Sequence, residues 1–348
     1  MEIIRKLSLP SQNVIRKKPS NQKNGDQYLF SNEFKRKLPN FSAVLKKNSF
    51  IPPCGRLFNG FTLNLLQFNT GIKKKGLFRS YLKSFLFLMK IRKITRFKNI
   101  LYVTNSNSHN FFHWSLDVLQ KLEFIDQFRN ELFNSKLKII IPCNHIDSYV
   151  KKSLKAFDLD IYFQKQNEII LSKRSILLPD IAPTGNYRKE IINKLSHRMR
   201  YFWNKKNTNK KYKNKIYISR KNSIKRKLVN EDEIIPILKK NGFNILDFDK
   251  LNFEKQLTYV LNSDIILTIH GASLTHMLWM KPGSKVLEIR AKKDINNNCY
   301  FTLASDLNHN YYYFVAEKTN QNKSNHLSDL FVNKDSFELE LKKYLKNR

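Results

Sequence analysis

Short, continuous apolar runs that alternate with helical patterns constrain the fold of this chain more than any other feature. Runs of this kind are typical of parallel strands, which helices cover on both faces of the sheet. We expect strands at residues 100–103, 138–142, 161, 176–178, 215–219, 243–246, 264–269 and 285–289. Helical patterns alternate with them at residues 112–124, 146–157, 189–203, 231–241, 253–262 and 273–280. The alternation predicts an α/β protein with two doubly wound sheets.

A polar stretch at residues 186–214, rich in Lys and Asn towards its end, separates the two halves of this pattern. A chain of 348 residues is long enough for about two domains, so we place the domain boundary there. The first 50 residues are polar and basic, and their prolines interrupt any helix, which favours an irregular arm. The expected organisation is an arm at 1–50, an N-terminal Rossmann-like domain at 51–200, a C-terminal Rossmann-like domain at 201–325 and a C-terminal helix at 326–348.

The chain is strongly basic, with 64 Lys and Arg against 28 Asp and Glu and a net charge of +36. Such a charge indicates anionic partners and says little about fold, and a nucleotide-biased genome would also produce it. Sixteen basic residues lie between Phe34 and Leu116, where there is no Asp or Glu. We expect this tract to contact an anionic membrane surface. Within it, residues 77–97 fit a basic amphipathic helix or a core helix with a solvated basic face.

The cysteines indicate neither a disulfide framework nor a zinc site. Cys54, Cys143 and Cys299 are far apart, and none has a His nearby at metal-ligand spacing. No apolar run approaches the roughly 18 residues of a membrane span, and the N-terminus lacks the apolar region of a signal peptide. We therefore expect a cytoplasmic protein that can lie at the inner face of the membrane.

The segment at residues 264–289 contains the clearest candidate binding site. An apolar strand ends at His270, Gly271 and Ala272 allow a tight turn, and a helix begins near Ser273. Ligands of open α/β sheets bind where the chain leaves the carboxyl end of a strand and opens a helix. Free backbone N–H groups at such a helix start suit a diphosphate, and Gly271 permits a close approach. A purely structural turn capped by Ser273 is the alternative.

A hydrolase would use the same segment differently. Residues 271–275 nearly follow the G-x-S-x-G pattern, in which Ser273 would be a nucleophile, but the second glycine is missing. Asp306 and His309 are only three residues apart, too close for a triad assembled from separate strand ends. The pattern therefore disfavours a hydrolase.

Three segments resemble, in the same order, the motifs of glycosyltransferase family 61. They are NSNSHNFFHWSLDVLQKLEFI at residues 105–125, KIYISRKNSIKRKLVNEDEIIPIL at residues 215–238 and HGASLTHMLWMKPGSKVLEI at residues 270–289. The resemblance implies a GT-B architecture, in which two Rossmann-like domains face a cleft, and an inverting sugar transfer without an obligatory metal. The bacterial members of the family resemble capsular polysaccharide biosynthesis proteins. This chain has Ser273 where the family commonly has Gly, and His276 where Asn is common.

The resemblance also implies the partners and part of the donor site. The donor would be a nucleotide sugar, most simply a UDP-sugar, and the acceptor a glycan or a lipid-linked glycan, with no bound cofactor. Arg220 stands at the Ser-Arg position of the family, and an arginine can donate two parallel hydrogen bonds to phosphate oxygens. Glu288, at a strand end, can accept both hydroxyls of the ribose, or it is a surface acid. The D-x-D pattern of Asp247 and Asp249 recurs by chance, so we expect no metal site.

His113 and Asp117 are the candidate general bases. They are four residues apart on a helix that follows a strand, so they share one helix face near the ligand edge of the first sheet. An acceptor hydroxyl must lose its proton as it attacks, and either side chain can take it. We expect Asp117 to be the base, because the surrounding cations should keep it ionised, with His113 sharing the role or orienting the carboxylate. A solvated polar helix face is the alternative.

Two other functions fit the composition. A nucleic-acid-binding protein would explain the net charge, but the chain has no zinc-finger spacing, RNP-like motif or localised helix-turn-helix, and its basic residues are spread along the sequence. A non-catalytic protein docked on a membrane through residues 34–116 would explain the missing acids there. The three ordered motifs favour the glycosyltransferase, and we expect no nucleic-acid partner.

Overall fold

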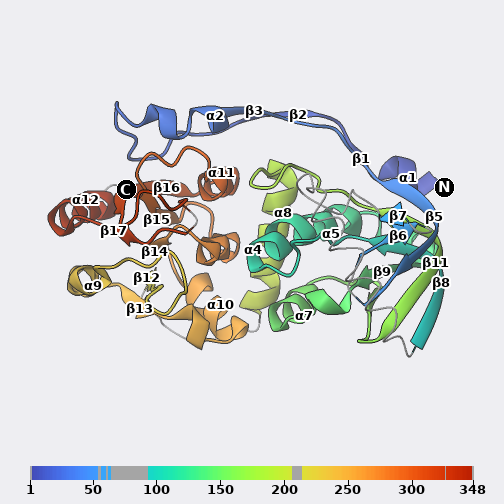
Figure 1. The fold of residues 1–348 in the computed structure, drawn as a ribbon. Helices are drawn as coiled ribbons and strands as arrows, with labels where there is room; N and C mark the ends of the chain where they lie inside the picture. The colour runs from blue at the N-terminus through green and yellow to red at the C-terminus, as the bar shows by residue number, and fades with distance from the viewer. Residues whose placement is uncertain are drawn as a thin grey trace. The chain divides into compact units, whose positions relative to one another are not determined.

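The computed structural model describes residues 2–53, 56–59, 62–63, 93–205, 214–325 and 327–346. The chain forms two compact units (Figure 1). The N-terminal unit comprises residues 1–12 and 37–191, and the C-terminal unit comprises residues 13–36 and 192–348. None of the helices in the described ranges is long and apolar enough to cross a membrane.

Within the described residues, the N-terminal unit contains a seven-stranded sheet with the strand order β10-β9-β8-β11-β5-β6-β7. The first four strands are parallel, and β5 to β7 add in antiparallel fashion. In chain order the strands are β5 (Val44–Ile51), β6 (Phe58–Asn59), β7 (Thr62–Leu63), β8 (Lys93–Tyr102), β9 (Leu137–Ile141), β10 (Ile161–Phe163) and β11 (Glu168–Leu177). The helical segments are α1 (Glu2–Lys6), α4 (Phe111–His113), η3 (Trp114–Val118), α5 (Leu119–Asp126), α6 (Arg129–Asn134), η4 (Cys143–His145) and α7 (Ser148–Leu154).

The C-terminal unit contains a six-stranded sheet among its described residues, with the order β13-β12-β14-β15-β16-β17. All pairs are parallel except β16 with β17. The strands are β12 (Lys215–Ile218), β13 (Asn244–Leu246), β14 (Ile265–Ile269), β15 (Lys285–Ala291), β16 (Asn310–Lys318) and β17 (Leu330–Phe331). The helical segments are η1 (Gln27–Leu29), α2 (Ser31–Phe34), α9 (Glu231–Lys240), η5 (Phe248–Lys250), α10 (Phe253–Leu261), η6 (Ala272–Trp279), α11 (Cys299–Asp306) and α12 (Lys334–Lys346). Helix α8 (Lys189–Asn204) contains the division between the two units.

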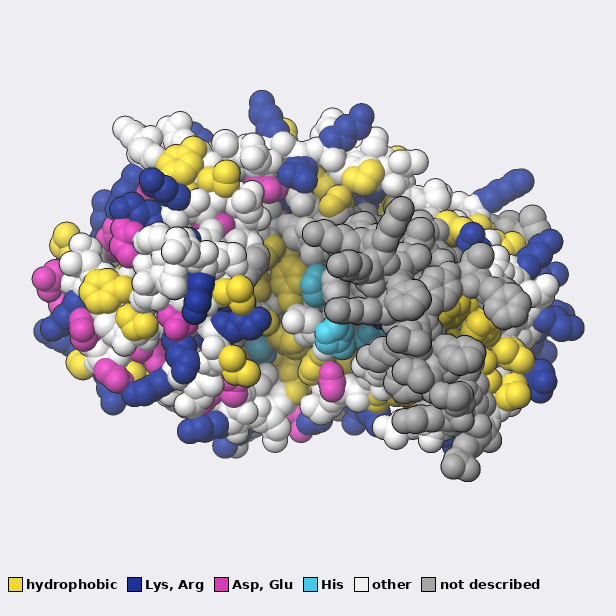
Figure 2. Space-filling view, viewed as in Figure 1, with side chains coloured by type: hydrophobic (Ala, Val, Ile, Leu, Met, Phe, Trp, Pro, Cys, Tyr) yellow, Lys and Arg dark blue, Asp and Glu magenta, His cyan; other side chains and the backbone are white. Residues whose placement is uncertain are grey.

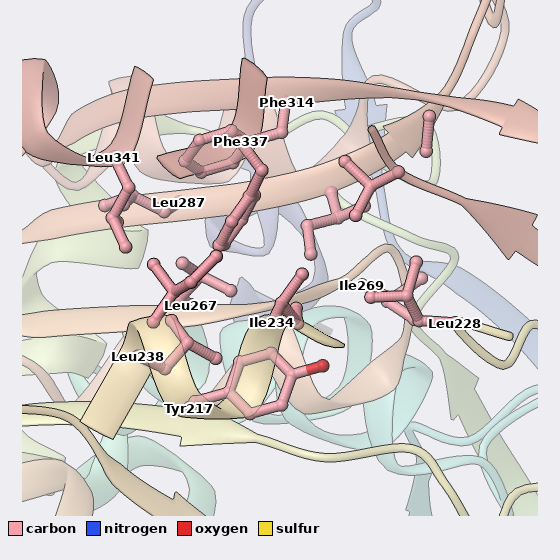
Figure 3. Close-up of a cluster of buried hydrophobic side chains, with 14 of the residues drawn as sticks. Tyr217, Leu228, Ile234, Leu238, Leu267, Ile269, Leu287, Phe314, Phe337 and Leu341 are labelled. Carbon is pink, nitrogen blue, oxygen red and sulfur yellow. The ribbon is translucent and has the colours of Figure 1, made fainter. Parts of the chain in front are cut away.

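The core of the C-terminal unit lies between its sheet and two helices (Figure 3). Ile234 and Leu238 of α9, with Phe337 and Leu341 of α12, pack on a strand layer. That layer is supplied by Tyr217, Leu267, Leu287 and Phe314. Because helices cover these strands, most of their side chains are apolar, which is why the sequence pattern located them.

The predicted α/β class is confirmed, and an observed strand overlaps each expected one. The expectation for residues 1–50 is wrong at 44–51, because β5 joins the sheet there through antiparallel pairing with β11. Two short ribbons also form, in which β1 (Ser8–Leu9) pairs with β4 (Phe41–Ser42) and β2 (Gln12–Ile15) with β3 (Lys35–Leu38). Lys46, Lys47 and Asn48 in the middle of β5 interrupt any apolar pattern, so the sequence did not predict this strand.

Residues 13–36 contribute to the core of the C-terminal unit, which the sequence did not indicate. The ring of Phe30 is fully buried and lies 4.8 Å from that of Phe301. Arg16 forms a buried ion pair with Asp306, with 3.0 Å between the nearest nitrogen and oxygen. The expected helix at residues 77–97 falls mainly outside the described residues, and its end at 93–97 belongs to β8.

Candidate functional site

Each parallel sheet has a point at which the strand order reverses. In the N-terminal unit the chain runs from β8 outward to β9 and β10 and then returns to β11 on the other side of β8. In the C-terminal unit it runs from β12 to β13 and returns to β14 on the other side of β12. Ligands of open α/β sheets bind outside the carboxyl ends of the strands at such a point. The loops after β8, β11, β12 and β14 are therefore the candidate sites.

In the N-terminal unit, His113 and Asp117 form a hydrogen-bonded pair. Asn110 caps the helix after β8, where its side chain accepts a hydrogen bond from the backbone N–H of Phe112 at 2.9 Å. The next turn, η3, is a π-helix, a wider turn that is frequent at functional sites. Nδ1 of His113 lies 2.8 Å from Oδ2 of Asp117, so the predicted shared face is confirmed.

The two members of this pair differ in exposure. The side chain of His113 is 20% exposed and that of Asp117 is 4% exposed. Among the described residues, none is hydrogen-bonded to Nε2 of His113. Burial raises the pKa of Asp117, while the hydrogen bond from His113 lowers it, the charge of Asp180 raises it and that of Lys121 lowers it. Desolvation is therefore the largest effect on this carboxyl, and it acts against the nearby cations that were expected to keep Asp117 ionised.

A buried network joins the ends of β8 and β11. Lys121 is almost fully buried, and its Nζ donates to Oδ1 of Asp180 at 2.6 Å and to the carbonyl of Val103 at 3.0 Å. Nδ2 of Asn105 also donates to Asp180, at 3.2 Å. Asp180 was not singled out from the sequence, although it follows an expected strand, and a search of every strand end for carboxylates would have found it. The network fixes the loops beside Asp117.

In the C-terminal unit, Arg220 and Gly271 come together from the loops after β12 and β14. A Cβ atom added to Gly271 would lie 2.8 Å from Nη1 of Arg220. The φ angle of Gly271 is 166°, an extended conformation open to any residue. Gly271 therefore leaves space beside its Cα atom, and the guanidinium of Arg220 occupies that space.

The guanidinium of Arg220 is held by backbone carbonyls. Nε donates to the carbonyl of Arg226 at 3.4 Å, and Nη2 donates to that of Lys225 at 3.2 Å. Burial lowers the pKa of Arg220, and the charge of Arg226 adds to the effect. No described carboxylate is within ion-pair distance of this guanidinium, which keeps its positive charge for a ligand.

The buried carboxylate of Glu288 holds the ring of His270 in place. Nδ1 of His270 lies 2.6 Å from Oε1 of Glu288, and Oε2 of Glu288 accepts a hydrogen bond from the hydroxyl of Tyr311 at 2.7 Å. Arg290 extends this hydrogen-bonded network, because its Nη1 donates to the hydroxyl of Tyr311 at 3.3 Å. Glu288 is fully buried and both of its oxygens are engaged, so the expected contact with ribose hydroxyls must be corrected. Glu288 lies inside β15, beneath the turn that contains His270.

Ala272 and Ser273 are half-buried at the start of η6. This segment is a 3-10 helix, and Gly271 is its N-cap residue. The alternative, a turn capped by the side chain of Ser273, is wrong, since no side-chain hydrogen bond caps this end. The first N–H groups of the helix therefore keep their capacity to bind an anion.

The residues of the hydrolase alternative do not form a triad. Asp306 forms an ion pair with Arg16, and Nε2 of His309 donates a hydrogen bond to the carbonyl of Met277 at 3.0 Å. Burial lowers the pKa of His309 to about 4. His276 is also buried, bonded to the carbonyl of Ser273 and to Gln256, and burial lowers its pKa to about 4. Both histidines support the structure of this unit.

The D-x-D acids serve a local structural role. Oδ1 of Asp247 accepts from the backbone N–H of Asp249 at 3.1 Å and caps η5, while Oδ2 accepts from Asn222 at 2.7 Å. Within the described ranges, no group of three or more His, Cys, Asp or Glu side chains could hold a metal ion.

Basic side chains do not gather into one stripe on the face seen in Figure 2. Lys and Arg side chains of the described residues are scattered there among Asp, Glu and apolar side chains. A nucleic-acid interface concentrates such charges on one face or along one helix. The distribution on this face gives that alternative no support.

Two doubly wound α/β units with polar residues at the reversal of strand order define a class of proteins that bind ligands at strand ends. The sequence model of the family described as Glycosyltransferase 61 matches residues 111–287, just over half of the chain. The chain belongs to the glycosyltransferase 61 family.

The chain is also similar to proteins named EGF domain-specific O-linked N-acetylglucosamine transferase. The Drosophila melanogaster protein is 34% identical over 91 residues, which are 25% of this chain and 17% of that protein. The Gallus gallus protein is 34% identical over 84 residues, 23% of this chain and 15% of that protein. The Mus musculus protein is 34% identical over 84 residues, 23% of this chain and 16% of that protein. The match thus spans at most 17% of the length of these relatives.

Proposed function

We propose that this protein is an inverting glycosyltransferase. It moves a sugar from a nucleotide-sugar donor to a hydroxyl of a surface polysaccharide or lipid-linked glycan. The observation that carries the proposal is the guanidinium of Arg220 packed on Gly271, where the strand order of the C-terminal sheet reverses. A parallel sheet places nucleotide ligands at this position.

The donor diphosphate binds at the C-terminal unit. Arg220 and the free N–H groups at the start of η6 hold its phosphate oxygens, with Ala272 and Ser273 at the contact. His270 lies in the same turn and donates a hydrogen bond to the diphosphate, while Glu288 holds its ring. Fixed donors of this kind stabilise the charge that develops on the leaving diphosphate, and they make a metal unnecessary.

The acceptor hydroxyl is activated at the N-terminal unit. Asp117 holds Nδ1 of His113, so that Nε2 takes the proton of the hydroxyl as its oxygen attacks the anomeric carbon. The bond from that carbon to the diphosphate breaks, and the diphosphate leaves with the electron pair. The geometry favours His113 as the base and Asp117 as the residue that orients it, the reverse of the order expected from the sequence.

We further propose that the two units face a common cleft in a GT-B arrangement, with the donor on the C-terminal unit and the acceptor on the N-terminal unit. UDP-N-acetylglucosamine is the first donor to test, because the relatives are named N-acetylglucosamine transferases. A lipid-linked acceptor would place the protein at an anionic membrane surface. Sedimentation with anionic and neutral vesicles tests that contact, which should weaken with salt.

Protection against thermal unfolding by a panel of nucleotide sugars tests the proposal. A ligand that binds only the folded protein raises the melting temperature. Arg220→Ala should weaken nucleotide binding about 10- to 100-fold, the value of a hydrogen bond to a charged group, and leave the melting temperature of the free protein unchanged. The control is Lys221→Ala, which removes a neighbouring exposed cation that pairs with Asp232. If no nucleotide sugar shifts the melting temperature, the proposal fails.

A further inference from the structure

Three basic side chains of the N-terminal unit gather near the carboxyl edge of its sheet. His109 lies in the loop after β8, and His145 ends η4, directly after β9. Since β8 and β9 are adjacent parallel strands, these loops are neighbours. The two imidazole rings are nearly parallel, with 14° between their planes and 6.3 Å between their centres.

Arg56 reaches the same place from another segment. The thiol of Cys143 donates to the carbonyl of Pro53 at 2.9 Å, which ties the chain just before Arg56 to η4. The positive charge of Arg56 is close enough to act on His145. Burial lowers the pKa of His145 to about 3, and the charges of His109 and Arg56 lower it in the same direction.

Two nitrogens of this cluster are buried without partners. Nδ1 of His145 and Nη1 of Arg56 are shielded from solvent and have no hydrogen-bond partner among the described residues. His145 is only 2% exposed. A buried donor left unsatisfied destabilises a protein, so such a group usually has a partner in the protein, a water molecule or a ligand. No described carboxylate pairs with either side chain, so the charge of Arg56 is not balanced within the described residues.

We propose that Arg56, His109 and His145 bind an oxyanion carried by the acceptor, so that the acceptor is an anionic glycan. An oxyanion supplies acceptor atoms for the two buried nitrogens, and its negative charge pairs with the guanidinium of Arg56. A guanidinium suits both phosphate and carboxylate. The two sources are therefore the phosphate of a lipid-linked sugar and the carboxylate of an acidic sugar.

The position of the cluster connects it to the proposed base. His109 lies in the connection between β8 and α4, four residues before His113, the last residue of α4. The hydroxyl of Tyr149 in α7 donates to the backbone carbonyl of His109 at 2.6 Å and holds this connection in place. An oxyanion bound here anchors the acceptor beside the residue that deprotonates it. This inference rests on the proposed function, since it names the class of acceptor for that site.

Calorimetric titration of the full-length Arg220→Ala protein tests the inference, because this background silences the nucleotide site. The probes are inorganic phosphate, glucuronate and, as the neutral control, glucose. We expect one oxyanion to bind and glucose not to bind. Phosphate binding identifies the lipid-linked source, and glucuronate binding identifies the acidic sugar. If neither binds, the inference is overturned.

Variants distinguish a specific binding site from nonspecific attraction of anions to a basic protein. Arg56→Gln should weaken oxyanion binding at least 10-fold, whereas Arg174→Gln, which removes an exposed arginine of the same unit, should leave it unchanged. Equal losses in both variants would overturn the inference. An imidazole NMR titration gives a readout that does not depend on a variant folding, since the pKa of His145 should rise when the oxyanion binds. An unchanged pKa at saturating oxyanion would also overturn it.

The two proposals fail in distinguishable ways. If nucleotide sugars protect the protein and no oxyanion binds to the N-terminal unit, the transferase proposal stands and the acceptor class is wrong. If an oxyanion binds through Arg56 and no nucleotide sugar protects, the anion site stands and the proposed function is wrong.

Discussion

The two units place different chemistry at the same kind of position, the point where the order of the parallel strands reverses. In the N-terminal unit the loop after β8 leads to an imidazole held by a carboxylate within one helix. In the C-terminal unit the loops after β12 and β14 bring a guanidinium against a glycine. Strand order determines where a ligand can bind in both units, while the residues just beyond the strands determine what each site can do.

The helices that follow these strands differ as well. The N-terminal unit places a wide π turn, η3, at its candidate base, and the C-terminal unit places a tight 3-10 helix, η6, at its candidate phosphate site. Such departures from α-helix geometry are frequent at functional positions. The π turn η3 places the side chains of His113 and Asp117 on one helix face. The 3-10 helix η6 presents backbone N–H groups next to Arg220.

The largest expected effect is on the imidazole and carboxylate pair. His113→Ala should lower kcat by roughly 100-fold or more, as the loss of a general base does, with donor affinity unchanged. Asp117→Asn should cost about 10-fold, because the amide oxygen can still accept the hydrogen bond of the ring without its charge. Steady-state kinetics with the donor found by thermal protection measures both.

The relative size of these two losses decides between the two assignments. A near-normal rate for His113→Ala, together with a loss of about 100-fold or more for Asp117→Asn, would return the role of base to Asp117. Normal rates for both would remove the pair from the reaction, and the N-terminal unit would then need another base.

The next effect concerns the space that Gly271 leaves for Arg220. Gly271→Ala should push the guanidinium aside, because the added Cβ would lie 2.8 Å from Nη1. Nucleotide affinity should fall about 10-fold, the value of one charge-assisted hydrogen bond, with little loss of stability, since the end of a flexible side chain can move. Calorimetry with UDP measures the affinity.

Gly25→Ala provides the matched control, because a Cβ added at Gly25 meets no atom within 4 Å. Its affinity for UDP should equal that of the unchanged protein. If Gly271→Ala binds as tightly as this control, Arg220 does not need its observed position to bind the donor.

The smallest effect at neutral pH is expected for the buried histidines. His276 has its pKa lowered to about 4, against 6.5 for an exposed histidine. Above pH 6.5 neither the folded nor the unfolded form is protonated at this ring. Between pH 6.5 and 4 the unfolded form takes up a proton that the folded form does not, so stability falls with falling pH by about 1.4 kcal/mol per pH unit for each such group.

His276→Asn should therefore reduce the loss of stability on acidification by about one proton, in addition to a loss that does not depend on pH, because the variant removes a buried ring that packs on Phe248. Denaturant unfolding at a series of pH values measures the slope. His197→Asn changes an exposed histidine of the same unit and serves as the control. An unaltered slope in His276→Asn would show that the ring is protonated in the folded protein.

The candidate site was partly predictable from the sequence. Arg220 and Gly271 follow apolar strands, and strand ends can be located from local patterns alone. Their mutual contact could not be predicted, because it depends on two loops separated by 50 residues in the chain. Glu288 is a case in which the local pattern misled: its position at an expected strand end predicted a contact with the ligand. In the structure its side chain lies on the face of β15 that contacts Tyr311 and His270.

The sequence by itself determined the order of strands and helices, because helices cover the parallel strands and a continuous apolar run marks each of them. It also determined the pairing of His113 with Asp117, since a spacing of four residues is local to one helix. The tertiary structure decided that β5 joins the sheet, that residues 13–36 pack in the C-terminal unit, and that Asp117 is desolvated. Each of these depends on contacts between segments far apart in the chain, and burial and strand pairing are set by those contacts.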